Sequence, residues 1–65
     1  MNNDELKEAL FSKCPVEYRG VVYSHVSAII YKNKKGKLKI SAELMDKNKN
    51  SVTIAIPSWV KEVKQ

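Results

Sequence analysis

Two stretches between residues 36 and 56, in which apolar and polar residues alternate, constrain this chain more than any other feature. Side chains of a strand point to opposite faces with a period of two, so each stretch predicts a strand with one buried and one exposed face. Residues 46–50, between the two stretches, are rich in turn-forming asparagine and aspartate, which predicts an antiparallel hairpin. The residues expected on its buried face are Leu38, Ile40, Ala42 and Leu44 in the first strand, and Val52, Ile54 and Ile56 in the second.

The rest of the chain must cover this hairpin, because an isolated hairpin is only marginally stable in water. The 65 residues predict one domain. Cys14 and His25 are the only cysteine and the only histidine, so we expect neither an internal disulfide nor a metal site, and no cofactor. No apolar run approaches the ~20 residues that span a bilayer, and the acidic N-terminus is unlike a signal peptide. We therefore expect a cytoplasmic protein without a membrane partner.

Residues 4–13 predict a helix whose apolar face comprises Leu6, Ala9 and Leu10, with Phe11 as a further docking residue. Five strands are then expected, at about residues 15–18, 21–32, 38–45, 51–56 and 61–64. The sequence thus predicts a mainly β, α+β fold, in which an N-terminal helix precedes a small antiparallel five-stranded barrel or meander sheet.

Residues 21–32 are apolar on both faces of the expected strand. Such a strand is either covered on both sides or switches faces at a bulge or bend. We predict that its second face is covered by the helix at residues 4–13, by another copy of the chain, or by both. The first face carries Val22, Ser24, Val26, Ala28 and Ile30, and the second carries Val21, Tyr23, His25, Ser27, Ile29 and Tyr31.

Residues 57–65 leave two structures open. A short 3₁₀ turn starting at Pro57 would lead to a last strand at residues 61–64 that pairs with the first strand. A one-turn C-terminal helix is the competing prediction. Trp59 lies in this turn and is expected to plug one end of the barrel rather than to contact a ligand.

This order of elements resembles that of the SH3-like barrels, in which a 3₁₀ turn precedes the last strand, and of the Sm-like RNA-binding proteins, which add an N-terminal helix. The sequence departs from the Sm-like signatures, because VVYSHVSAIIYK and LKISAELMDKN lack their glycine motifs and TIAIPSWV replaces the tyrosine-lysine-histidine motif. No ring-forming or RNA-binding residue is therefore carried over. The run SAIIYKNKKGKLKISAELMDKNKNSV is similar to short uncharacterised proteins of phages and prophages of low-GC Gram-positive bacteria, which implies a mobile-element origin and a bacterial cytoplasm.

The positive charge is concentrated in one part of the chain. Residues 1–20 carry three cations and four carboxylates, whereas residues 21–65 carry nine lysines and three carboxylates. Five of the nine lysines lie within eight residues around the turn at residues 33–37, next to an aromatic side chain, and could follow a phosphate backbone of DNA or RNA. Codon bias of an A/T-rich genome, or a solvated turn that resists aggregation, is the alternative origin of this charge. The predicted nucleic-acid-binding residues are Lys32, Lys34, Lys35, Lys37, Lys39 and Tyr31.

A protein-interaction module that modulates a host protein is the alternative function. Its predicted interaction face comprises Tyr23, His25 and Ile29 on the strand at residues 21–32, and Tyr18 is a further contact candidate. Catalysis is not expected. Cys14 and His25 lack a third group to orient them, and neither a glycine-rich phosphate loop nor a pair of catalytic acids is present.

Overall fold

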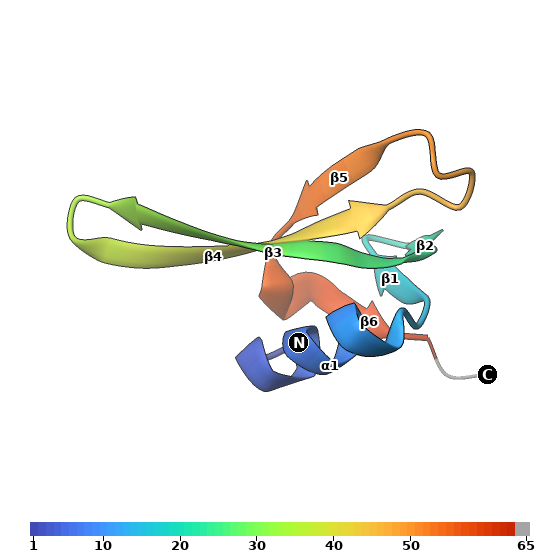
Figure 1. Ribbon diagram of the computed structural model, residues 1–65, viewed down its shortest axis with the longest axis horizontal. Coiled ribbons are helices and arrows are strands. Elements are labelled where there is room, and N and C mark those ends of the chain that lie inside the picture. The colour runs from blue at the N-terminus through green and yellow to red at the C-terminus, as the bar shows by residue number, and fades with distance from the viewer. Residues whose placement is uncertain (64–65) are drawn as a thin grey trace.

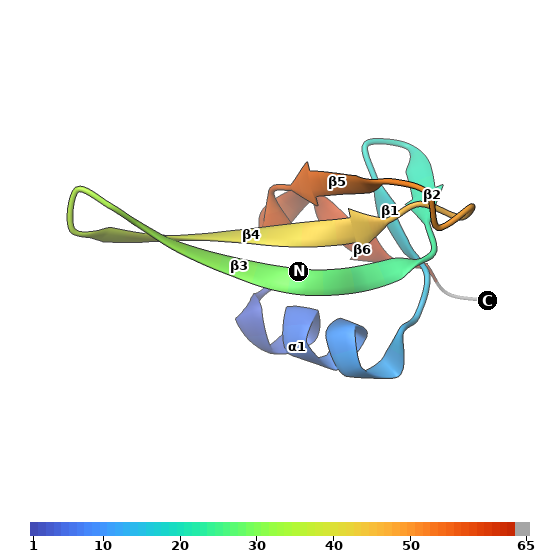
Figure 2. The same ribbon diagram turned by 45° about the horizontal axis from the view of Figure 1, so that its top comes forward.

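The structure, a computed structural model, describes residues 1–63. These residues form one α-helix, six strands and one 3₁₀ turn (Figure 1). The strands lie in two antiparallel three-stranded sheets, with the helix packed beneath them in the view of Figure 2. The mainly β fold with an N-terminal helix is confirmed. The two sheets are not closed into the expected five-stranded barrel.

Helix α1 spans Asn3–Ser12 and begins with a capping box. The side-chain oxygen of Asn2 accepts a hydrogen bond from the Glu5 amide at 2.8 Å, and the Glu5 carboxylate accepts one from the Asn2 amide at 2.9 Å. Both bonds satisfy amides that have no partner within the helix. The helix ends at Lys13, whose left-handed backbone (φ 57°) lets its amide donate to the carbonyl of Ala9.

The helix docks through the predicted face. Leu6 is fully buried, Ala9 is buried, and Leu10 packs partly against the core. Phe11 does not dock, because it is 84% exposed. Successive helical residues are turned by ~100° from one another, so Phe11 points away from the sheet when Leu10 touches it.

The first sheet has the order β2-β1-β6, formed by β1 (Val16–Tyr18), β2 (Val21–Tyr23) and β6 (Val60–Glu62). Arg19 and Gly20 both have positive φ and form the two-residue turn between β1 and β2. The 3₁₀ turn η1 (Pro57–Trp59) leads directly into β6, which pairs with β1 as the first C-terminal alternative predicts. Lys64, the end of that predicted strand, lies outside the described residues.

The second sheet has the order β3-β4-β5, formed by β3 (His25–Lys34), β4 (Lys37–Met45) and β5 (Val52–Ala55). The single long strand predicted at residues 21–32 is divided between the two sheets, at Ser24. The Ser24 amide donates to the carbonyl of Met45 at 2.8 Å, and a bulge follows between Val26 and Ala28. The bend and the bulge switch the buried face, which explains why both faces of this stretch are apolar.

The inner face of the second sheet joins the core, and the register shows which β5 residues lie on it. Ala42 of β4 is opposite Ala55 of β5. Ala42 is fully buried and paired residues share a face, so Ala55 points inward and is only 2% exposed. The predicted face of β5 is therefore wrong: its larger residues point outward, with exposed fractions of 45% for Val52 and 55% for Ile54, and Ile56, which follows β5, is 53% exposed.

The second face of the long stretch is covered by α1 where it belongs to β3. Ile29 lies opposite Ala42 on the inner face and packs partly against the core, and the Tyr31 hydroxyl donates a hydrogen bond to Asn3 Oδ1 at 3.2 Å. Val21, on β2, stays 52% exposed. Helix α1 packs against β3, and Ile29 packs against the core that includes Leu6 and Ala9 of this helix. Across residues 1–63, no helix has the length and apolarity needed to cross a bilayer.

Candidate nucleic-acid interface

The β3–β4 hairpin projects beyond the rest of the molecule as a two-stranded arm, defined here as residues 31–40 (Figure 1). This projection makes the molecule elongated, with extents of 38 × 23 × 21 Å. Every residue from Tyr31 to Lys39 is exposed. A ribbon that contacts so little of its own protein has both faces available to a partner.

The tip of the arm is a two-residue turn formed by Lys35 (φ 51°) and Gly36 (φ 80°). Two successive residues with positive φ match the twist of the flanking strands. The Asn33 side-chain oxygen accepts a hydrogen bond from the Gly36 amide at 3.0 Å. The turn fixes the register, with Lys34 directly opposite Lys37.

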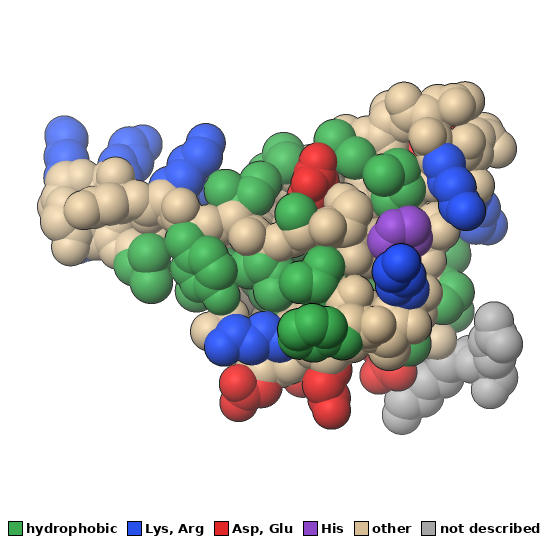
Figure 3. Space-filling view, viewed as in Figure 1, with side chains coloured by type: hydrophobic (Ala, Val, Ile, Leu, Met, Phe, Trp, Pro, Cys, Tyr) green, Lys and Arg blue, Asp and Glu red, His purple; other side chains and the backbone are tan. Residues whose placement is uncertain are grey.

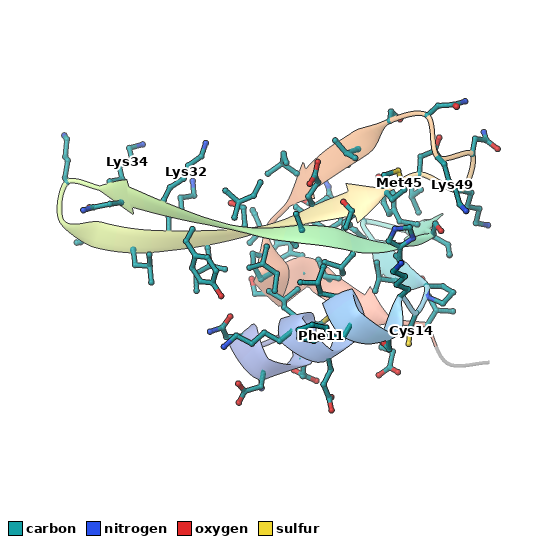
Figure 4. The ribbon with its side chains drawn as sticks, viewed as in Figure 1. Phe11, Cys14, Lys32, Lys34, Met45 and Lys49 are labelled. Atoms are coloured by element: carbon teal, nitrogen blue, oxygen red, sulfur yellow. The ribbon has the colours of Figure 1, made fainter. Side chains whose placement is uncertain are left out.

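Four lysines share one face of the arm because of that register. Lys32 lies opposite Lys39, two residues along the ladder from the pair of Lys34 and Lys37. Paired residues share a face, as do residues two apart on a strand, so the two pairs form a single lysine face. Figure 4 shows Lys32 and Lys34 projecting to the same side of the ribbon. Of the predicted binding residues, the fold thus brings together Lys32, Lys34, Lys37 and Lys39, with Lys35 at the tip.

Tyr31, the aromatic member of the predicted site, does not belong to the lysine face. It is paired with Ile40 on the opposite face of the arm. It is 48% exposed, and its hydroxyl is held by Asn3 of the helix. Its ring therefore lies at the junction between the arm and the helix and not on the lysine face.

The remaining charges are separated from the arm. The loop that carries Lys47 and Lys49 is at the opposite end of the molecule, as a meander predicts, and Figure 4 places Lys49 there. The acidic residues of the first helical turn, Asp4 and Glu5, belong to α1. In Figure 3 most of the visible acidic side chains lie on the side of the molecule that carries the helix, although basic side chains lie there too, whereas basic side chains rise from the opposite side of the arm. The charge is thus unevenly distributed.

The predicted interaction face is not assembled. Tyr23 lies on β2 in the first sheet. Ile29 is on the inner face of the second sheet, whereas His25 is paired with Met45. The register shift that follows Val26 changes which side chains share a face, so the alternation counted along the sequence does not survive it.

The aromatic residues near η1 also differ from expectation. Trp59 does not plug a barrel end, because it is 56% exposed and Val60, the next residue, is buried instead. The guanidinium of Arg19 lies 5.9 Å from the centroid of the Trp59 ring, in cation–π geometry. Tyr18, the further contact candidate, is only 8% exposed and belongs to the core.

A second exposed surface was not predicted as such. It consists of Val52, Ile54 and Ile56, and we call it the outer apolar surface. Glu43 of β4 lies directly opposite Ile54, so a charged residue borders the outer apolar surface. The alternating pattern contained the signal, but the pattern alone does not say which of the two faces is buried.

Cys14 and His25 each lie beside a serine. Cys14 Sγ lies 2.9 Å from Ser12 Oγ, and His25 Nδ1 lies 2.9 Å from Ser24 Oγ, so the two residues have different partners. Within residues 1–63, no group of three or more metal-ligating side chains is close enough together to hold an ion.

Comparisons of the chain with protein-family models, with curated proteins and with solved structures found no match.

Proposed function

We propose that this chain is a non-enzymatic module that binds nucleic acid through contacts between lysines and phosphates. The observation that carries the proposal is the lysine face, in which Lys32, Lys34, Lys37 and Lys39 form two cross-strand pairs on a projecting arm. Like charges placed directly opposite each other are unfavourable in a free hairpin. A polyanion lying along this face removes that repulsion and releases its own counterions.

Lysine chemistry sets the kind of recognition. A lysine ammonium is a compact point charge that suits phosphate, whereas the planar fork of arginine reads base edges. The sole arginine, Arg19, is in the turn between β1 and β2 and not on the arm. Binding is therefore mainly electrostatic and weakly dependent on sequence.

Fluorescence anisotropy with labelled oligonucleotides at several salt concentrations tests the proposal. With four or five phosphate contacts, the logarithm of affinity for a duplex falls against the logarithm of salt concentration with a slope of about −4. The variant K32Q/K39Q loses about two contacts and flattens the slope to about −2. The matched variant K47Q/K49Q removes the same charge from the distant loop and leaves the slope unchanged. Absence of binding to any DNA or RNA at low salt would rule the proposal out.

The finer relation of the fold and the origin of the chain belong to the same proposal. The order of elements, with η1 before the last strand, supports a relation to the small SH3-like and Sm-like barrels. The expected resemblance of the run SAIIYKNKKGKLKISAELMDKNKNSV to phage and prophage proteins adds to the proposal a mobile-element origin and a bacterial cytoplasm.

A protein-interaction module that modulates a host protein is the second candidate, and the outer apolar surface favours it. Val52, Ile54 and Ile56 leave apolar side chains about half exposed on one sheet face, which a host protein or a second copy of the chain can cover. Recovery of partners from bacterial lysate, with and without nuclease, separates the candidates. A single protein partner that survives nuclease treatment favours this function, whereas loss of all partners favours nucleic-acid binding.

A further inference from the structure

We infer that the preferred ligand of the arm is double-stranded B-form DNA, with the arm lying in the major groove and its lysine pairs reaching the phosphates of both strands. This inference rests on the proposed function and adds the class of nucleic acid. It depends on the geometry of the pairs, on the position of Tyr31 and on the width of a two-stranded ribbon.

The two lysines of a pair can reach phosphates on both sides of the major groove. In Lys32/Lys39 and Lys34/Lys37 the two lysines stand directly opposite each other across β3 and β4. Facing Cα atoms in an antiparallel pair are ~4.5–5.5 Å apart, and an extended lysine reaches roughly 6 Å from its Cα. If the two side chains of a pair lean outward over opposite edges of the ribbon, one pair can therefore span up to about 17 Å, which exceeds the ~12 Å width of the major groove. A single strand offers only one backbone, so it leaves one lysine of each pair without a phosphate.

The arm lacks the means to bind unpaired bases on this face. Proteins that hold single strands stack the bases on aromatic side chains. Tyr31 is the one aromatic residue among residues 31–40. It lies on the face opposite the lysines, and its hydroxyl is bonded to Asn3. Stacking and phosphate contacts are thus directed to opposite sides of the arm, which disfavours a single-stranded ligand.

The ribbon also discriminates between duplexes. The major groove of B-form DNA admits a two-stranded β-ribbon. The major groove of A-form RNA is deep and narrow, and side chains do not reach into it. The acidic side chains on the helix side of the molecule keep that side away from a polyanion (Figure 3). The arm is therefore the part of the molecule that enters the groove.

The test measures anisotropy with three probes of 20 nucleotides or base pairs: a mixed-sequence DNA duplex, one of its single strands, and an RNA duplex of the same sequence. We expect the DNA duplex to bind at least about five-fold more tightly than either of the other two. Two variants with equal charge then test the geometry. K32Q/K34Q removes both lysines of one strand of the arm, whereas K34Q/K37Q removes one whole pair. Because a single strand contacts one lysine of each pair, K32Q/K34Q should abolish the preference for duplex over single strand, whereas K34Q/K37Q, which keeps one complete pair, should retain part of it.

The outcomes separate this inference from the proposed function. Equal or tighter binding of the single strand or of the RNA duplex, with a steep salt dependence, overturns the inference and leaves nucleic-acid binding intact. Equal loss of preference in the two variants also overturns it, since the lysines then act only by their number. If none of the three probes is bound, the proposed function is overturned as well. Circular dichroism of each variant shows whether the fold is kept, and the exposure of the replaced lysines predicts that it is.

Discussion

Lys32 of β3 lies directly opposite Lys39 of β4, on the same face of a projecting hairpin. Facing like charges destabilise a strand pair by an amount comparable to the ~0.2–1 kcal/mol that a favourable pair contributes. Lys34 and Lys37 repeat the arrangement at the next position on the same face. The free arm is therefore held in an electrostatically unfavourable form that an anionic ligand would stabilise.

Replacing Lys39 with glutamate should stabilise the fold while weakening nucleic-acid binding. The substitution converts a repulsive cross-strand pair with Lys32 into an attractive one, which predicts a gain of up to ~1 kcal/mol. For a chain of this size, that corresponds to a rise in Tm of about 4–8 °C. Thermal unfolding and anisotropy with a DNA duplex measure the two effects.

Lys47→Glu provides the control for Lys39→Glu, because it changes the net charge equally in the loop at the other end of the molecule. We expect Lys47→Glu to change the affinity for the DNA duplex only slightly. Equal loss of affinity in the two variants would show that overall charge, and not the arm, determines binding.

The second prediction concerns the turn at the tip of the arm. Gly36 has a φ of 80°, and a Cβ added there meets no atom within 4 Å. Gly36→Ala should therefore destabilise the hairpin through backbone strain alone, by ~1–2 kcal/mol. Lys35→Asn should stabilise the hairpin by a few tenths of a kcal/mol, because asparagine tolerates the left-handed φ of 51° better than lysine does.

Urea unfolding measures both turn variants, and NMR spectra of the arm residues show whether the effect is local. Lys35→Ala controls for the loss of charge, since it removes the ammonium without favouring positive φ. If Lys35→Ala is as stabilising as Lys35→Asn, relief of charge repulsion explains the effect better than the turn.

The register of the arm can be predicted from the sequence, but the face of β5 that is buried cannot. A two-residue turn at Lys35 and Gly36 places Lys34 opposite Lys37 without further assumptions. The face of β5, by contrast, depends on the pairing of Ala55 with the fully buried Ala42. The branched residues of β5 suggested the reverse, because hydrophobicity alone does not reveal where a small side chain is required for close packing.

Trp59 and Phe11 show the same limit. Both were expected to be buried because they are large and apolar, and both are exposed. A chain of this length has too little interior for every large side chain. Which ones it excludes is decided by the positions of α1 and η1, and these positions depend on contacts between residues far apart in the sequence. The existence of the helix depended only on local signals and was predicted, and a bend in the long strand was one of the two alternatives that its apolar faces left open.

The helix offers a matched pair of variants for the core. Leu6 is fully buried beneath the sheets, whereas Phe11 is 84% exposed on the same helix. Leu6→Ala should destabilise the fold by ~2–5 kcal/mol, which equals most of the ~3–5 kcal/mol expected for a domain of this size. Phe11→Ala should change stability by less than about 0.5 kcal/mol. Urea unfolding tests both, and a large loss for Phe11→Ala would show that the side chain is covered in solution.

The outer apolar surface leads to the last prediction, which compares two isoleucines on opposite faces of the second sheet. Ile54 points outward, is 55% exposed and lies opposite Glu43, so Ile54→Lys places a cation beside a carboxylate. We expect its stability to stay within about 0.5 kcal/mol of the parent chain. Ile29 lies opposite the fully buried Ala42 and packs against the core, so Ile29→Lys should unfold the chain.

Light scattering and thermal unfolding of Ile54→Lys then decide whether the outer apolar surface is used. If a second copy covers it, the parent chain has twice the mass of one chain and Ile54→Lys has the mass of one, with the fold retained. If a host protein covers it, the parent chain is already a monomer, and Ile54→Lys loses that partner in the nuclease-treated lysate while Lys34→Glu keeps it. A variant that keeps both its mass and its partner would show that this surface is simply solvent-exposed, and it would remove the observation that favours the protein-interaction function.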